Sequence, residues 1–307
     1  YEEELALLST DQEAKYAVAL NDYGVLLEEM GRFEEATDCL TKAWEIQQDL
    51  FGPDSPEAIS TCNNLGMIMA DTGDFEEAET LYRHALRIAL SYYKEGHPET
   101  AVLYSNLGEL LMRSAEYDEE EPDDVFTEDE DSAEDDILAK DRLTKDDAEV
   151  ATPIEDRLAE SRHYLMRSLE INTDAYGLSY PDNACTLSNL GILEDMEGNH
   201  GKAREHYRKA LEIQSAVAGA DHPHCADILH NLGVSYIEEA LEPFSSPEEF
   251  SAASLEQKKD ALPMLHKALE CERKALRILD SVAGLSQNSI EMLRNEVAWL
   301  ENELDLG

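Results

Sequence analysis

The 307-residue chain carries 69 acidic and 24 basic residues, which gives a formal net charge of −45 at neutral pH. This charge argues against nucleic acid and anionic membrane surfaces as partners, because both are bound through basic patches, and it favours a neutral or basic protein partner. No stretch approaches the roughly 18 apolar residues of a membrane span, so we expect no direct membrane insertion.

An internal repeat of 42 residues runs along the chain. Gly108 follows Gly66 after 42 residues, Gly233 follows Gly191 at the same distance, and a proline stands ten residues before each of these four glycines. Self-similarity of this size indicates a solenoid of stacked units and overrides the two domains that length alone suggests. The repeat glycines are Gly24, Gly66, Gly108, Gly191 and Gly233.

Each repeat is predicted to be a pair of helices. The first helix carries the repeat glycine and ends at a second glycine such as Gly73. The second opens with acidic residues, as in FEEA at residues 33–36 and 75–78, which suits the positive end of the helix dipole. A glycine inside a helix costs about 1 kcal/mol relative to alanine. We infer that it is used here because it lets the two helices approach closely.

These motifs resemble the tetratricopeptide repeat family. The family pattern of Leu-Gly, then Ala-x-x-x-aromatic, then Pro is found at Leu65, Gly66, Ala78, Tyr82 and Pro98, and again at Leu190, Gly191, Ala203, Tyr207 and Pro223. The usual repeat has about 34 residues, and 42 resembles the longer-helix variety of kinesin light chains and related adaptors. The resemblance implies an all-α, right-handed superhelical solenoid of helical hairpins, and a non-enzymatic scaffold for protein–protein interactions.

The predicted elements divide the chain into five parts. Residues 1–11 form the end of an upstream helix or an N-terminal extension, 12–115 form repeats 1 and 2 and the first helix of repeat 3, and 116–153 form an acidic insertion. Residues 154–287 form the rest of repeat 3 and repeats 4 and 5, with an insertion at about 241–257, and 288–307 form a capping helix.

The acidic insertion holds 18 acidic and 3 basic residues within 116–149. We expect a solvated, disordered loop. Two sharper hypotheses remain open: the loop binds a basic partner, or Thr127 and Ser132 are sites for an acidophilic kinase.

A second insertion adds 23 residues between Gly233 and Ala275. Here Ser246 and Pro247 predict a capped helix start, and we expect one long helix over residues 255–279. Trp299, in the capping helix, either faces a partner or packs partly against the surface.

No catalytic residue, cofactor or metal site is expected. The stretch GNHGK at residues 198–202 lacks the spacing of a phosphate-binding loop. His222 and Cys225 lie in HPHC, which occupies the turn before a repeat proline, and no second His/Cys cluster completes a four-ligand site.

The best candidate binding residues are amides at one repeat position, two residues before the glycine. The resemblance implies that this position on the first helix lines a concave groove. There an amide can grip a peptide backbone, because it both donates and accepts hydrogen bonds; alternatively, the amides tie neighbouring helices together or face water. The amides at this position are Asn64, Asn106, Asn189 and Asn231, and Asp22 holds the position in the first repeat.

Nearby acidic residues bear on the ligand. Glu29 and Asp71 lie seven residues, about two helical turns, beyond that position. The basic clamp of chaperone-binding tetratricopeptide repeats is missing, so a neutral or basic peptide is expected.

Two functions follow from these features. The first is an adaptor that grips peptide segments in the groove, and the second is a structural or assembly subunit of a large multiprotein complex that uses its acidic insertion and convex face.

The five scattered cysteines, without CxxC spacing, indicate an intracellular reducing compartment. We expect the cytoplasm first, and a mitochondrial or plastid compartment as the alternative. Because the chain starts at Tyr1, we also expect that an upstream segment was removed or left out, which favours the second function.

Overall fold

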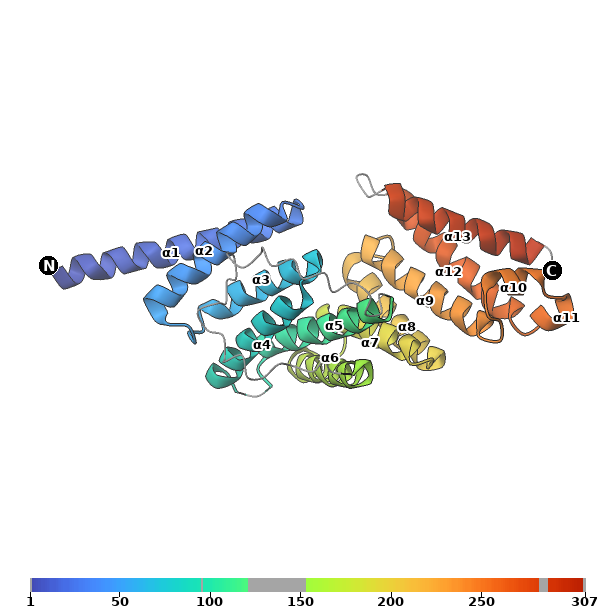
Figure 1. The fold of residues 1–307 in the computed structure, drawn as a ribbon, viewed down its shortest axis with the longest axis horizontal. Helices are drawn as coiled ribbons and strands as arrows, with labels where there is room; N and C mark the ends of the chain where they lie inside the picture. Colours follow the sequence, from blue (N-terminus) through green and yellow to red (C-terminus); the bar gives the residue numbers. More distant parts are fainter. Residues whose placement is uncertain (1, 95, 121–152, 282–286, 306–307) are drawn as a thin grey trace, which may run out of the picture. The chain divides into compact units, whose positions relative to one another are not determined.

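The computed structural model describes residues 2–94, 96–120, 153–281 and 287–305, and within these ranges every regular element is a helix. The first part holds α1 (Glu2–Glu29), α2 (Phe33–Phe51), α3 (Ala58–Thr72), α4 (Phe75–Tyr92), α5 (Pro98–Glu120) and α6 (Ile154–Tyr176). The second holds α7 (Asp182–Met196), α8 (His200–Ala218), α9 (Pro223–Leu241), α10 (Pro247–Ala252), α11 (Leu255–Lys258), α12 (Leu262–Ser281) and α13 (Gln287–Asp305). Figure 1 shows this order.

The chain forms two compact units, Tyr1–Ile171 and Asn172–Gly307. In unit 1, α1 pairs with α2 and α3 with α4, and the pairs stack because α2 packs on α3 and α4 on α5. In unit 2, α7 pairs with α8 and α9 with α12, while α8 packs on α9 and α12 on α13. The all-α solenoid of helical hairpins predicted from the sequence is confirmed.

Glycine sets the contact within each hairpin. A Cβ on Gly66 of α3 would lie 2.7 Å from Cε1 of Tyr82 on α4, well inside van der Waals contact. The helix then ends at Gly73, whose φ of +92° is the left-handed conformation that glycine adopts without strain. The two glycines therefore have different roles: Gly66 lets α4 approach, and Gly73 turns the chain toward it.

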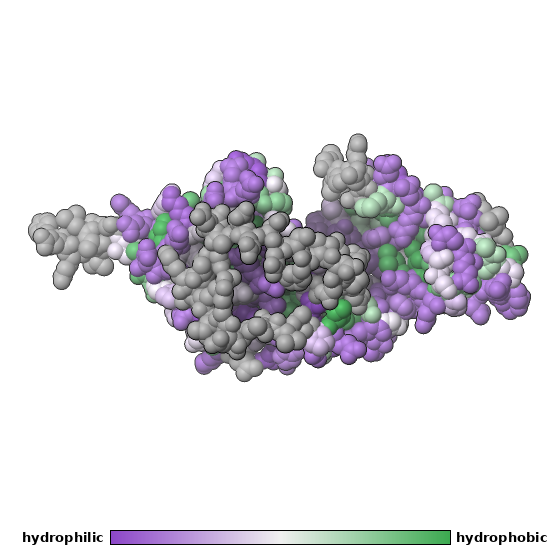
Figure 2. Space-filling view, viewed as in Figure 1, coloured by the Kyte–Doolittle hydropathy of each residue, from purple (hydrophilic) through white to green (hydrophobic). Residues whose placement is uncertain are grey.

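The core of unit 1 is built from the apolar stripes of these helices. Leu40, Leu65 and Leu81 are fully buried, and Trp44, at the repeat position of Leu86, is 3% exposed. Burying a side chain of this size contributes about 1.5–3 kcal/mol. Where the residues are coloured, the visible face is mostly hydrophilic, with some hydrophobic patches (Figure 2). Among the described helices, none combines the length and apolar character needed to cross a membrane.

The prediction of one long helix over residues 255–279 is wrong. The chain forms the short α11 and then restarts at Leu262 in α12. Pro263 explains the break, because proline lacks an N–H group and is accommodated in the first turn of a helix rather than inside one. Ser246 caps α10 as predicted, since its side chain accepts a hydrogen bond from the Glu249 N–H.

The remaining expectations for the insertions have mixed outcomes. Helix α5 extends to Glu120 and so runs past residue 115, where the acidic insertion was expected to begin. The rest of that insertion up to residue 152, with Thr127 and Ser132, lies outside the described residues. Trp299 is half-buried and its ring centroid lies 6.4 Å from that of Phe250 in α10, so it packs against the second insertion.

The thiols differ sharply in exposure, which makes their alkylation a test of the fold. Cys62 is fully buried, and burial raises its pKa to about 12, whereas Cys185 is exposed. Only the thiolate reacts. At about pH 8 we expect iodoacetamide to modify Cys185 at least ~100-fold faster than Cys62. Time-resolved peptide mapping by mass spectrometry measures both rates. The two rates should become similar in the denatured chain, and similar rates in the native chain would contradict this packing.

Candidate peptide-binding groove

The predicted amide position forms a ladder between successive first helices of unit 1. Asn64 Nδ2 on α3 donates to Asn21 Oδ1 on α1 at 3.1 Å, and Asn106 Nδ2 on α5 donates to Asn63 Oδ1 on α3 at 2.8 Å. The structure therefore shows the tie between neighbouring helices that the sequence had left as one alternative. Asn64 and Asn106 each still have a second N–H and a carbonyl oxygen that these two bonds do not use.

The other predicted residues lie on the same faces of their helices. Asp22 is exposed beside Asn21, whose Nδ2 lies 3.5 Å from the Asp22 carboxylate. Glu29 and Asp71 are exposed at the ends of α1 and α3. In unit 2, Asn189 on α7 and Asn231 on α9 are half-buried.

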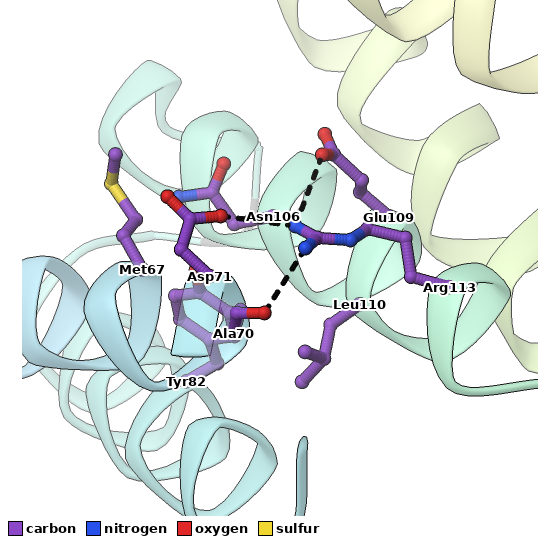
Figure 3. Close-up of a pocket in the computed structure, with 8 residues that line it drawn as sticks. All are labelled: Met67, Ala70, Asp71, Tyr82, Asn106, Glu109, Leu110 and Arg113. Carbon is purple, nitrogen blue, oxygen red and sulfur yellow. Dashed lines mark hydrogen bonds and ion pairs between the residues drawn. The ribbon is translucent and has the colours of Figure 1, made fainter. Parts of the chain in front are cut away.

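A cavity of about 240 Å³ opens between α3, α4 and α5. Figure 3 shows Arg113 reaching across it from α5, with its guanidinium between the carboxylates of Asp71 and Glu109. Arg113 lies 3.3 Å from Asp71 and 4.0 Å from Glu109, and it also donates to the Ala70 carbonyl oxygen at 3.0 Å. The cavity is lined by Met67, Ala70, Asp71, Tyr82, Asn106, Glu109, Leu110 and Arg113.

Arg113 was not among the binding residues predicted from the sequence. It stands five residues after Gly108, as Glu29 and Asp71 stand five after their own glycines. Following that repeat position into the third repeat would have found it. The groove of unit 1 thus contains one basic residue that the predicted acidic character did not include.

Carboxylates crowd one another along this face. The pKa of Glu28 is raised by partial burial and by the nearby charges of Asp71 and Glu29. Burial and the charges of Glu109 and Asp71 likewise raise the pKa of the Tyr82 hydroxyl. A cation placed here would relieve this repulsion, since opposite charges favour the ionised carboxylate.

Unit 2 has its own polar cluster, between α7, α8 and α9. His200 Nδ1 lies 2.8 Å from Asp195 and 3.7 Å from Glu238, and Ser235 Oγ donates to Asp195 at 2.7 Å. The pKa of Glu238 is raised by burial and by the charge of Asp195. The predicted turn at HPHC is also present: His222 caps α9 by accepting from the His224 N–H.

The comparisons with known proteins agree with this architecture. The sequence profile of the tetratricopeptide repeat matches residues 15–91, 61–122, 154–216 and 196–241. The chain belongs to the tetratricopeptide repeat family. Members of this family are generally non-enzymatic, and membership supports a scaffold for protein–protein interactions.

Solved structures share the fold. The nearly identical TPR-like repeats of a Podosopora anserina protein assigned as a kinesin light chain match with 14% identity and a TM-score of 0.54, over 86% of this chain and 98% of that one. A thermophilic TPR protein of Thermus thermophilus matches with 14% identity and a TM-score of 0.53, over 93% of this chain and 99% of that one. A comparison with curated protein sequences gives no match.

Proposed function

We propose that the protein is a non-enzymatic adaptor that holds an extended, neutral or basic segment of a partner protein against the face formed by α1, α3 and α5. The crowding of carboxylates on this face carries the proposal. Glu28, Glu29 and Asp71 interact electrostatically, and Arg113 is the one basic residue among those that line the cavity.

The asparagine side chains bind the backbone of the peptide in this proposal. Asn64 and Asn106 are held at fixed positions by their hydrogen bonds to Asn21 and Asn63. Their remaining donors and acceptors suit a peptide backbone of any sequence, while the carboxylates select for charge. Preorganised contacts of this kind reduce the entropy lost on binding.

Charge reversal tests the proposal. We expect the double variant Glu29→Lys/Asp71→Lys to weaken binding of a lysine-bearing peptide at least ~10-fold, because each reversal replaces attraction with repulsion. Fluorescence anisotropy with peptides of equal length and opposite charge measures this. Glu34→Lys/Glu45→Lys, at two exposed sites on α2, is the matched control for net charge.

Arg113 provides the opposite change. In Arg113→Gln, Asp71 loses its ion pair, so the basic peptide should bind more tightly than it does to the wild type. The proposal would be contradicted if the wild type and the double variant bound the basic peptide with equal affinity. It would also be contradicted if the wild type bound the acidic and the basic peptide equally.

A further inference from the structure

In unit 2, three ionisable side chains from three helices meet at one point. His230 Nδ1 on α9 lies 3.1 Å from Glu272 Oε2 on α12 and 3.8 Å from Glu296 Oε2 on α13. One potential ligand atom from each residue lies within 4.8 Å of the other two. This cluster is in unit 2, whereas the proposed peptide groove is in unit 1, and it is independent of that proposal.

The cluster breaks the packing rule of the other repeats. Where the second helix meets the repeat glycine, the earlier repeats place an apolar or aromatic side chain: Leu40 on Gly24, Tyr82 on Gly66, Leu165 on Gly108 and Tyr207 on Gly191. Repeat 5 instead places Glu272 against Gly233. Glu272 is fully buried, and a carboxylate in a leucine position is costly unless it is paired.

The two partners of Glu272 stand at the ladder positions. His230 occupies the repeat position of Asn21 and Asn63. One period of 42 residues plus the 23-residue insertion leads from Asn231 to Glu296, so Glu296 takes the amide position in the capping helix. In unit 1 two amides make the contact between successive first helices, and here an imidazole and a carboxylate make it. At these three positions, the other repeats carry packing or amide residues, whereas this end of unit 2 carries residues that can bind a metal.

A second observation points to a ligand. Among the described residues, Glu272 Oε1 has no hydrogen-bond partner although it is buried. The buried carboxylate of Glu272 and the half-buried carboxylate of Glu296 carry negative charge that a bound cation would compensate.

We propose that His230, Glu272 and Glu296 bind a divalent transition-metal ion, with Zn²⁺ as the first candidate. Zn²⁺ bonds to His nitrogen and carboxylate oxygen are about 2.0–2.2 Å long, so tetrahedral donors lie about 3.3–3.6 Å apart. The observed 3.1 and 3.8 Å bracket that spacing. Imidazole with carboxylates suits Zn²⁺ rather than Ca²⁺ or Mg²⁺, which prefer shells of oxygen alone.

The ion would join the capping helix to the last hairpin. Its ligands come from α9, α12 and α13, and the side chain of His230 is 43% exposed, which gives the ion a path from solvent and a position for water. The site therefore acts on stability, as structural zinc does, and needs no catalytic step.

Calorimetric titration of the full chain with Zn²⁺, at about 150 mM salt to screen surface charge and with excess Mg²⁺, tests the site. We expect one bound ion and a raised thermal midpoint. Glu272→Leu, which installs the residue type of repeats 1 and 3, and His230→Asn, which installs that of repeats 1 and 2, should each weaken affinity at least ~10-fold, since even partners of ligands change affinity 10–100-fold.

Two further variants keep the result interpretable. Glu272→Gln preserves shape and should also lose Zn²⁺, while His266→Asn, an exposed site on α12, should not. The proposal would be overturned if the wild type bound Zn²⁺ no more tightly than Glu272→Leu does. It would also be overturned if His266→Asn lost as much affinity as the ligand variants. Binding that disappears with His200→Asn alone would overturn it too, because the ion would then lie at Asp195, His200 and Glu238.

Discussion

Replacing Lys258 with methionine is expected to destabilise unit 2 by about 3–5 kcal/mol, because it leaves a buried carboxylate without its cation. Lys258 Nζ lies 2.9 Å from Glu303 Oε2, and the two side chains are 5% and 3% exposed. Ser251 Oγ donates to the other oxygen of Glu303, and the Lys258 ammonium stands 4.6 Å from the centroid of the Phe250 ring. The pair joins the second insertion, α10 and α11, to the capping helix α13.

The contribution of this pair should depend on pH. Burial alone would raise the pKa of Glu303, but hydrogen bonds from Lys258 and Ser251 outweigh burial and lower it. A carboxylate whose folded pKa lies below its unfolded value of about 4.3 stabilises the fold above that value, and the stabilisation is lost as pH falls through the folded pKa. The difference between the wild type and Lys258→Met should therefore be full at neutral pH and shrink in acid.

Denaturant unfolding followed by circular dichroism measures these differences. Lys274→Met is the matched control, since Lys274 pairs with Glu270 on the surface of α12 at 49% and 68% exposure, and such pairs contribute about 0–1 kcal/mol. The double variant Lys258→Met/Glu303→Leu should recover most of the loss, because replacing both partners with apolar groups is often neutral. Equal effects of Lys258→Met and Lys274→Met would show that burial of the pair does not matter.

The features that the sequence predicted well are those encoded within one repeat. Gly66, Ala78 and Tyr82 lie within one helical hairpin, so their spacing reports a local contact directly. The fold class and the inter-helix glycine contact follow from this periodicity. The Asn64 position was also identified, but its hydrogen bond to Asn21 depends on how one repeat stacks on the next.

The features that the sequence did not predict are exceptions to the repeat. Arg113 stands where repeats 1 and 2 carry an acidic residue, and only a comparison of that one position across the repeats marks it. Glu272 and Glu296 lie 42 and 66 residues beyond His230, a separation at which spacing predicts contact only when the stacking and the 23-residue insertion are both known. The tertiary arrangement, rather than any local sequence pattern, places these three side chains next to one another.

The same substitution at two helical glycines should change stability in opposite directions. Gly66→Ala is expected to destabilise unit 1 by about 2 kcal/mol, because overpacking a filled interface costs about 1–3 kcal/mol or occasionally more and exceeds the gain in helix propensity of about 1 kcal/mol. Gly201→Ala, on α8 with no atom within 4 Å of the added methyl group, should stabilise by about 0.5–1 kcal/mol.

The size of the Gly66 effect depends on Tyr82. A Cβ on Gly66 would lie 2.7 and 2.9 Å from two atoms of the Tyr82 ring, well inside the optimal carbon–carbon separation of about 3.5–4.0 Å. The ring is only 3% exposed and has little room to move away. Helices α3 and α4 must therefore separate, which weakens the hairpin and its stacking on the neighbouring repeats.

A double-mutant cycle isolates this contact. Tyr82→Ala alone should cost about 3–5 kcal/mol through the cavity it leaves. In that background Gly66→Ala no longer meets a ring, so it should become neutral or stabilising, and the coupling energy should exceed about 1 kcal/mol. If Gly66→Ala costs the same with and without the Tyr82 ring, the glycine is not there for close packing, and its repetition along the chain would need another cause.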